Sequence, residues 1–341
     1  MLGALHQQVR RTIRRYDLLP AGSRVVVALS GGSDSVALTR LLADLSTHGG
    51  FVVAGCAHLN HGLRATADRD EAFCRTFAAS RALQLQVGRA DVAAYAAENG
   101  LSIEAAARKI RYSYLDSAAA DLGADCIASG HTRDDQAETF LMKLMRGAGQ
   151  AGLGGIYPRR GALIRPLLDV SREELRDWLR AGGQDWVEDE TNADLENPRN
   201  RIRISVLPEL AKALGGDPRP SIARAAALLR EDGEWLDATA EREFDRLVAG
   251  SDRGQTGVRP GSDQGQTLDA AQLLKLPPPV EARVLRLALG RLAGDREVTL
   301  EHVELARAVL RGQSAAVDVP GGRVELSRSL LVLLDRKAGP K

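Results

Sequence analysis

The sequence predicts an α/β protein: a doubly wound parallel sheet followed by a smaller, mainly helical C-terminal domain that ends in a β-hairpin. Two observations lead to this prediction. In about the first 150 residues, short apolar runs alternate with segments of helical periodicity, as in parallel sheets covered by helices on both faces. Beyond a glycine-rich stretch at 147–161, the strand-like runs give way to helices. The length of 341 residues fits two or three domains of roughly 150 residues.

The first domain is expected to comprise residues 1–215. It begins with an arginine-rich helix that reaches about residue 19. Ser171 and Glu174 have the spacing of a capping box at the start of a later helix. In chain order, the expected strands are 24–29, 51–59, 83–87 and 124–129, and the expected helices are 35–45, 68–81, 102–122, 134–145, 171–181 and 197–214.

The second domain is expected to comprise residues 216–341. Its first segment, 222–247, is amphipathic with apolar residues on one helical face. A low-complexity segment of Gly, Ser, Asp and Gln near 250–266 predicts a flexible linker or loop. The remaining expected elements are helices at 277–290 and 299–311 and a hairpin of strands 316–319 and 323–334.

Composition narrows the classes of protein to consider. Hydrophobic residues make up 44% of the chain and charged residues 27%, which is typical of globular proteins. No apolar run approaches the ~20 residues that a membrane span needs, and no signal peptide is evident, so we expect a cytoplasmic protein. The net charge of +1 means that nucleic-acid binding would have to use local basic patches. The three cysteines are far apart and form no C-x-x-C motif.

The strongest motif is Ser30–Ser35, with the sequence SGGSDS, directly after the first predicted strand. Its glycines let a phosphate approach the backbone, and the following helix offers free N–H groups and a positive dipole. The alternative is a glycine-rich turn in which Ser33 caps the helix. The motif lacks the Gly-Lys-Ser/Thr of a Walker loop and the spacing of a dinucleotide-binding loop.

Two further motifs are expected beside this loop. His58–Arg64, HLNHGLR, lies at the end of the second strand, where open α/β sheets bind ligands. Its histidines could contact a nucleotide or substrate, be satisfied within the loop, or bind a metal, although no third ligand is evident. Arg108 and Arg111 share one face of the long helix, either as a solvated basic surface or as guanidinium groups that bind phosphate.

Acidic and basic residues mark three more candidate regions. Gly130–Thr139, GHTRDDQAET, follows the fourth strand and places Asp135 and Glu138 on one helical face. These acids could serve chemistry or simply complement the helix dipole. Residues 140–168 contain arginines and glycines but no acidic residue, and 197–203 is also basic. Both segments could follow a phosphate backbone or form solvated loops and turns.

Together these motifs resemble, in order over residues 24–211, the tRNA(Ile)-lysidine synthase family of PP-loop ATP pyrophosphatases. The resemblance implies a PP-loop fold of the adenine nucleotide alpha hydrolase type. It also implies that ATP adenylates the wobble cytidine of an isoleucine tRNA with a CAU anticodon. Free L-lysine then displaces AMP to give lysidine, which changes codon reading from AUG to AUA. The C-terminal third resembles the family only in its helices and final hairpin, and the resemblance implies that the second domain, residues 216–341, binds tRNA.

The resemblance also implies the expected site residues, with ATP and Mg²⁺ as cofactors and Asp34 placed to help hold Mg²⁺. A site that selects lysine should present carboxylate to its ammonium group. The expected catalytic residues are Asp34, Arg111, His131, Asp135 and Glu138; the ATP-binding residues are Ser30, Gly31, Gly32, Ser33, Asp34, Ser35, His58 and Arg111; the lysine-binding residues are Asp135 and Glu138; and the tRNA-binding residues are Arg146, Arg159, Arg160, Arg199, Arg201 and Arg203.

Two other functions are compatible with such a loop. A tRNA sulfur transferase shares PP-loop chemistry, but it would normally need cysteines or an iron–sulfur cluster near the site. A non-catalytic module that binds adenine nucleotides would have little use for the carboxylate pair. The sequence leaves the oligomeric state open, including a homodimer.

Overall fold

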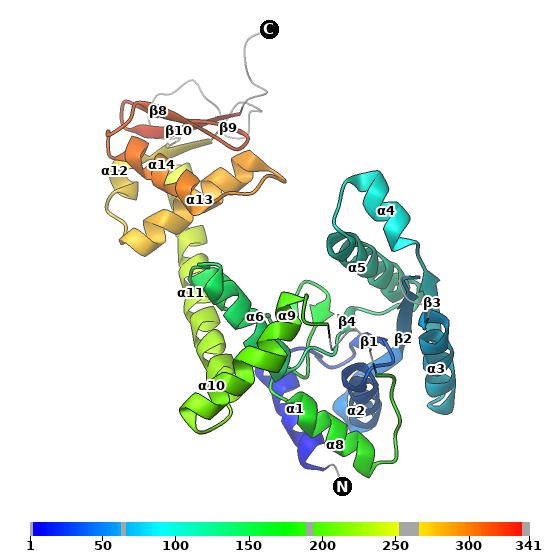
Figure 1. Cartoon of the computed structure of the whole chain (residues 1–341). Coiled ribbons are helices and arrows are strands. Elements are labelled where there is room, and N and C mark those ends of the chain that lie inside the picture. The colour runs from blue at the N-terminus through cyan, green and yellow to red at the C-terminus, as the bar shows by residue number, and fades with distance from the viewer. Residues whose placement is uncertain (1–2, 63–65, 189–193, 252–265, 336–341) are drawn as a thin grey trace. The chain divides into compact units, whose positions relative to one another are not determined.

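The computed structural model describes residues 3–62, 66–188, 194–251 and 266–335. The chain forms two compact units, Met1–Arg230 and Glu231–Lys341 (Figure 1). The helix α11 (Arg219–Ser251) runs across this division, whereas the sequence placed the domain boundary after residue 215. Most of the predicted linker at 250–266 lies outside the described residues.

The first unit is built on a six-stranded sheet with the order β3-β2-β1-β4-β6-β5. All neighbouring strands are parallel except the pair β5 and β6. This arrangement confirms the doubly wound parallel sheet that the apolar runs predict. The strands are β1 (Arg24–Ala28), β2 (Val52–Asn60), β3 (Leu85–Arg89), β4 (Cys126–Ala128), β5 (Arg159–Arg160) and β6 (Leu163–Ile164).

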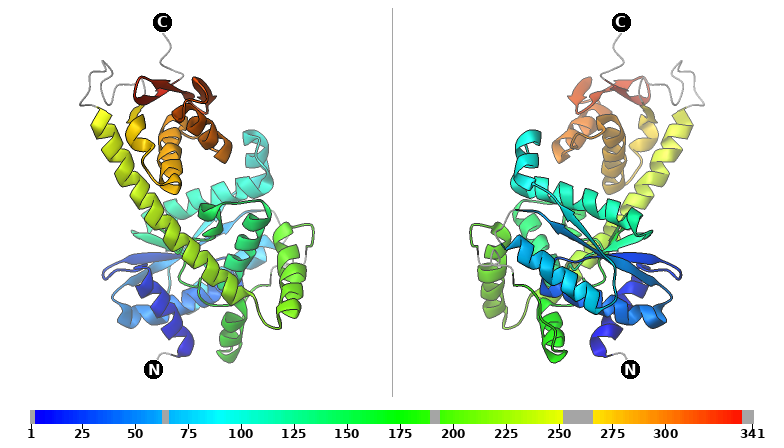
Figure 2. Two further views of the ribbon diagram at one scale, coloured as in Figure 1. Left: turned by 90° about the vertical axis from the view of Figure 1, so that its left-hand side faces the viewer. Right: turned by 90° about the vertical axis from the view of Figure 1, so that its right-hand side faces the viewer.

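Helices cover both faces of this sheet (Figure 2). Successive side chains of a strand point to opposite faces, so Val25 and Val27 join one apolar core while Val26 joins another. The helices and helical turns of the unit that precede α11 are α1 (Ala4–Arg15), α2 (Ser33–Gly49), α3 (Ala67–Ser80), α4 (Val92–Asn99), α5 (Ile103–Asp121), α6 (Arg133–Met145), α7 (Gln150–Leu153), α8 (Arg172–Ala181), α9 (Pro198–Arg201), the π-helical turn η2 (Ile202–Val206) and α10 (Leu207–Leu214).

The strand order places a topological switch point between β1 and β4. The chain leaves β1 toward β2 on one side of the sheet and later returns to β4 on the other side. In open α/β sheets, ligands bind beyond the carboxyl ends of the strands at such a point. Here α2 follows β1 and α6 follows β4, and α9 contacts α6 (Figure 1). The fold therefore brings both main sequence motifs to one edge.

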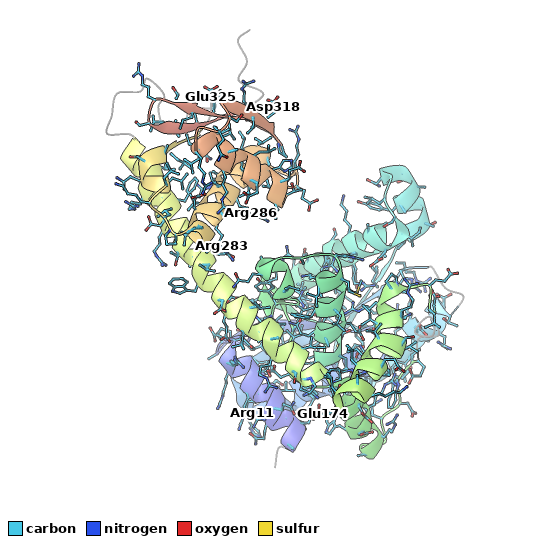
Figure 3. The ribbon with its side chains drawn as sticks, turned by 60° about the vertical axis from the view of Figure 1, so that its left-hand side comes forward. Arg11, Glu174, Arg283, Arg286, Asp318 and Glu325 are labelled. Atoms are coloured by element: carbon cyan, nitrogen blue, oxygen red, sulfur yellow. The ribbon has the colours of Figure 1, made fainter. Side chains whose placement is uncertain are left out.

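The second unit packs helices against an antiparallel sheet with the order β7-β10-β9-β8. Among its described residues the core contains one buried acid, Glu281, whose oxygens accept hydrogen bonds from Arg307 and Arg311. Arg283 and Arg286 project from α13 (Figure 3). The elements of the unit, after the end of α11, are β7 (Gln266–Asp269), α12 (Ala270–Leu273), α13 (Pro278–Ala293), α14 (Leu300–Leu310), β8 (Ala316–Val319), β9 (Gly322–Ser327) and β10 (Leu330–Asp335).

The predicted terminal hairpin needs a correction. Residues 323–334 do not form one strand, because the chain turns between β9 and β10, where Arg328 has a φ of 56°. The sheet also gains β7, which pairs with β10. In the first unit, α4 and the two short strands β5 and β6 were not expected from the sequence. The capping box of Ser171 and Glu174, in contrast, is present as predicted.

Candidate active site

A cavity of about 590 Å³ opens at the switch point of the parallel sheet. Apolar side chains from β1, β2 and α5 form part of its wall, and polar groups come from the loops after the strands. The cavity brings together Ser30, Gly32, Asp34, Ser35, His58, Arg108, Arg111, His131, Asp135 and Arg199. Of the expected catalytic residues, Glu138 does not line it.

The SGGSDS loop folds back on itself at the start of α2. The Ser35 hydroxyl lies 3.1 Å from that of Ser30 and donates a hydrogen bond to the Gly32 carbonyl at 3.0 Å. Gly31 has a φ of 88°, a conformation that favours glycine. Gly32, rather than Ser33, is the N-cap of α2, so the interpretation of Ser33 as a cap is wrong. No side chain caps the first-turn N–H groups of α2. These N–H groups lie at the positive end of the helix dipole and can donate hydrogen bonds to a bound anion.

The two strand-end loops touch each other closely at Gly130. A Cβ atom at this position would lie 3.1 Å from the backbone carbon of Asp34. Any other residue would require the β4–α6 loop and the SGGSDS loop to separate by a few tenths of an ångström. The glycine therefore fixes the spacing between the two motifs.

His58 lies on β2 beside the SGGSDS loop and is buried. Its Nδ1 is 2.9 Å from the carbonyl oxygen of Leu29, and because a carbonyl only accepts, Nδ1 carries the proton. Nε2 has no hydrogen-bond partner among the described residues. In a neutral ring this nitrogen is an acceptor for a donor group of a bound molecule.

Arg108 and Arg111 extend from α5 into the wall of the cavity. Both side chains are exposed, and neither has an acidic partner within 4.0 Å in the described part of the chain. Arg108 also lies over the ring of Tyr112, with 5.0 Å from its guanidinium carbon to the ring centroid. These two unpaired cations suit the binding of phosphate oxygens.

The two acids of α6 have different surroundings. Asp135 lines the cavity, and its Oδ2 accepts hydrogen bonds from the backbone and hydroxyl of Thr132 in a capping box. Glu138 is fully buried, and its oxygens accept from Arg199 at 2.7 Å and Arg203 at 2.6 Å. Both acids are paired with protein groups, but only Asp135 lines the cavity.

Arg172, which the sequence analysis did not single out, lies between the two motifs. Its Nε is 3.1 Å from Asp34 Oδ2, its Nη2 is 3.0 Å from Asp135 Oδ1, and its Nη1 is 3.6 Å from Glu138 Oε1. It is the first residue of α8, directly after the capping Ser171. A charged residue in the first turn of a helix gave no signal in the sequence that distinguished it from surface arginines.

The carboxylates and the histidine of the cavity differ in pKa. Burial raises the pKa of Asp34, although Arg172 opposes this shift. Burial also disfavours the charge of Asp135, but Arg172 and Arg199 outweigh it and lower the pKa of Asp135 to about 2. Burial lowers the pKa of His131 to about 4. At neutral pH, Asp135 is therefore an anion and His131 a neutral ring.

We expect the low pKa of His131 to make stability pH-dependent. In the unfolded chain the ring takes up a proton near its ordinary value of 6.5, whereas in the folded chain it does so only near 4. The unfolded state therefore binds more protons between these values, and folding stability falls as the pH drops from about 6.5 to about 4. Urea unfolding at several pH values should show a flatter dependence for His131→Gln than for the unchanged chain. Parallel curves for the two proteins would contradict the assignment.

The expected tRNA-binding arginines fall into three groups. Arg199 and Arg203 bind the acids of α6. Arg201 and Arg159 donate hydrogen bonds to backbone carbonyls, Arg201 to Leu195 and Glu196 and Arg159 to Asp17 and Leu18. The two with exposed side chains and no such contacts in the described residues are Arg146 and Arg160.

A resident metal site is not evident in residues 3–62, 66–188, 194–251 and 266–335. No three His, Cys, Asp or Glu side chains there are placed to hold an ion together.

No helix in these ranges combines the length and apolar character of a membrane span. Arg64 of the predicted HLNHGLR motif lies outside them.

Comparison with known proteins agrees with this geometry. Residues 4–210 match the PP-loop domain family, so the fold and the site define an ATP-utilising PP-loop enzyme. A tRNA(Ile)-lysidine synthase of Salinispora tropica is 40% identical over 333 residues, which cover 94% of this chain and 93% of that protein. The one of Geobacter sulfurreducens is 35% identical over 333 residues, which cover 96% of this chain and 67% of that protein. The chain belongs to the tRNA(Ile)-lysidine synthase family.

A solved structure shows the same fold in a more distant protein. The U34-tRNA thiolase NcsA from Methanococcus maripaludis, with its [4Fe-4S] cluster, aligns with a TM-score of 0.53 and 19% sequence identity. The alignment covers 66% of this chain and 78% of that one. At this identity the likeness concerns the fold alone.

Proposed function

We propose that this chain ligates free L-lysine to the wobble cytidine of isoleucine tRNA with a CAU anticodon, through an adenylated cytidine. The observation that carries the proposal is the membership in the tRNA(Ile)-lysidine synthase family over almost the whole chain. ATP supplies the adenylate that makes the base oxygen a leaving group, and the lysine amine then displaces AMP. The reaction uses ATP and releases AMP and pyrophosphate, so the enzyme is a ligase that forms a carbon–nitrogen bond.

ATP is proposed to lie in the 590 Å³ cavity with its phosphates on the SGGSDS loop. The first-turn N–H groups of α2 and the unpaired guanidinium groups of Arg108 and Arg111 are the donors available to phosphate. Mg²⁺ that accompanies ATP keeps several waters and phosphate oxygens, so one or two carboxylates suffice to bind it. Asp34, at the start of α2, is the proposed carboxylate. When bound, Mg²⁺ would neutralise part of the phosphate charge.

Lysine is proposed to place its ammonium group near Asp135, which stays ionised at neutral pH and lines the cavity. A carboxylate with a pKa of about 2 is a weak base, so Asp135 binds and orients the amine rather than deprotonating it. Glu138 is proposed to act indirectly. It binds Arg199, which also contacts Asp135 at 3.3 Å, and so fixes the positions of the charges around the lysine site.

The sulfur-transferase alternative finds little support in the cysteines. All three are buried. Burial raises the pKa of Cys56 and Cys74 to about 12 and that of Cys126 to about 11, so almost none is present as the nucleophilic thiolate at neutral pH. We therefore favour the ligase over the transferase.

Incorporation of labelled lysine into unfractionated tRNA tests the proposed function. We expect incorporation that requires ATP and that is confined to one isoleucine tRNA. Sulfur incorporation instead of lysine would support the transferase, and nucleotide binding with no pyrophosphate release would support a binding module. A cytoplasmic location and a homodimer stay predictions of the sequence.

We expect the affinity for tRNA to fall steeply with salt, because phosphate contacts release counterions. Replacing both Arg146 and Arg160 by glutamine should weaken tRNA binding and reduce the salt slope by about two contacts, while ATP binding stays unchanged. Arg11→Gln is the matched control, since Arg11 is an exposed arginine on α1 (Figure 3). Equal salt slopes in the double variant and the control would contradict a role for the two arginines.

A further inference from the structure

Three carboxylates converge on the single guanidinium group of Arg172. Asp34 comes from the start of α2, whereas Asp135 and Glu138 come from α6, and the three contacts are 3.1, 3.0 and 3.6 Å. The side chain of Arg172 is only 18% exposed, so water screens these contacts weakly. A cation at this point thus links the ATP loop to the acids of the lysine site.

The three acids do not depend on Arg172 to the same degree. Asp135 also contacts Arg199, and Glu138 contacts both Arg199 and Arg203. Asp34 has no other basic partner within 4.0 Å in the described chain; its Oδ1 accepts only from the Ser33 hydroxyl at 3.1 Å. If Arg172 moved away, Asp34 alone would lose its compensating charge, and a second cation would be favoured there.

We propose that Arg172 and a divalent cation compete for the Asp34 carboxylate, so that binding of the metal–ATP complex moves the Arg172 guanidinium from Asp34 onto phosphate oxygens. The inference rests on the proposed function, in which Asp34 holds the ATP-bound metal. Mg²⁺ binds carboxylate oxygens at 2.0–2.1 Å and repels a guanidinium group at the same oxygen. The two cations therefore exclude each other at Asp34, and Arg172 is a positioning residue for the metal–ATP complex.

The attachment of Arg172 suits such a displacement. Its backbone N–H donates a hydrogen bond to Asp134 Oδ2 at 2.9 Å, which fixes the main chain at the start of α8. The guanidinium group sits at the end of a long side chain and can change its partner while the helix stays in place. Once released, it is still close to the first turn of α2, where its planar donors match the oxygens of a phosphate group.

Binding of Mn²⁺ to the full chain without nucleotide, followed by electron paramagnetic resonance, tests the competition. Mn²⁺ serves as the probe because it shares the preference of Mg²⁺ for oxygen ligands. In Arg172→Gln we expect Mn²⁺ to bind about tenfold more tightly than in the unchanged chain, equivalent to about 1.4 kcal/mol. The double variant with Asp34→Asn should lose this gain. In calorimetry, Arg172→Gln should also bind Mg–ATP several-fold more weakly, since a phosphate partner is missing.

Arg176→Gln is the matched control. Arg176 lies one turn further along α8, with its Nε 3.4 Å from the Ser33 hydroxyl, and it pairs with Glu188 rather than Asp34. Its replacement removes a positive charge near the same loop and should leave the Mn²⁺ affinity unchanged. An equal gain in this control would mean that net charge, not competition at Asp34, sets the affinity, and would overturn the proposal.

An unchanged or weaker Mn²⁺ affinity in Arg172→Gln would also overturn it. If that variant fails to fold by circular dichroism, Arg172→Lys takes its place, because an ammonium group cannot hold three carboxylates as the guanidinium does. The Mn²⁺ affinity should then rise by a smaller factor, and no rise would count against competition. Since this assay contains neither tRNA nor lysine, a failure of lysine incorporation by the unchanged chain would be seen separately.

Discussion

Asp34→Asn should abolish most of the adenylation activity while the protein stays folded. The substitution keeps the size of the side chain but removes the charge proposed to hold the metal of Mg–ATP. We expect pyrophosphate release in the presence of tRNA to fall by about 100- to 1000-fold, the usual cost of losing one electrostatic contact to the transition state. Arg172 retains Asp135 and Glu138 as partners, so the loss of stability should be small.

The control for this prediction is Asp44→Asn on the same helix. Asp44 pairs with His6 and does not line the cavity. Pyrophosphate release and urea unfolding should both be measured for the two variants. Near-normal release by Asp34→Asn would show that the SGGSDS loop does not place this acid on the metal–phosphate complex.

Glu138→Gln should cost more stability than any other single acid-to-amide change in the cavity region. The carboxylate is fully buried and accepts hydrogen bonds from two arginines. Removing one partner from a buried ionic cluster typically costs ~3–5 kcal/mol, because the remaining charges stay desolvated. Arg199 and Arg203 keep 34% and 23% of their side-chain surface exposed, which places the expected cost toward the lower end.

Urea unfolding of Glu138→Gln beside Glu173→Gln measures this effect. Glu173 is exposed on α8, and its replacement should change stability by less than about 0.5 kcal/mol. Lysine saturation should be followed in the same preparations. If Glu138 instead binds the lysine ammonium directly, its variant would raise the KM for lysine with little loss of stability, and the supporting role assigned here would be wrong.

Local signals explain which parts of the fold the sequence could predict. The parallel sheet follows from apolar runs such as Val25–Leu29, and the start of α8 from the spacing of Ser171 and Glu174. These patterns involve neighbours along the chain. The four-residue α7 carries no such periodicity, and the two-residue strands β5 and β6 are defined by their pairing with each other and with β4.

In the candidate site, too, local features could be predicted from the sequence and long-range contacts could not. The loops after β1 and β4 could be placed together because parallel strands end at one edge of the sheet. The partners of their side chains could not, since they come from distant segments. Arg172 lies 138 residues from Asp34, and Arg199 lies 61 from Glu138. Phosphate contacts of the basic stretch at 197–203 stay a prediction, but the ion pairs of its Arg199 and Arg203 with Glu138 could not be foreseen from the sequence.

The two carboxylate oxygens of Asp135 have different partners. Oδ2 accepts from Thr132 and determines where α6 begins, and Oδ1 accepts from Arg172 and Arg199 beside the cavity. Asp135→Glu conserves the charge and could still close the capping box, as Glu174 does in α8, but its longer side chain would shift the carboxylate relative to Arg172 and Arg199. A substitution at this position therefore acts both on the first turn of α6 and on the ion pairs beside the cavity.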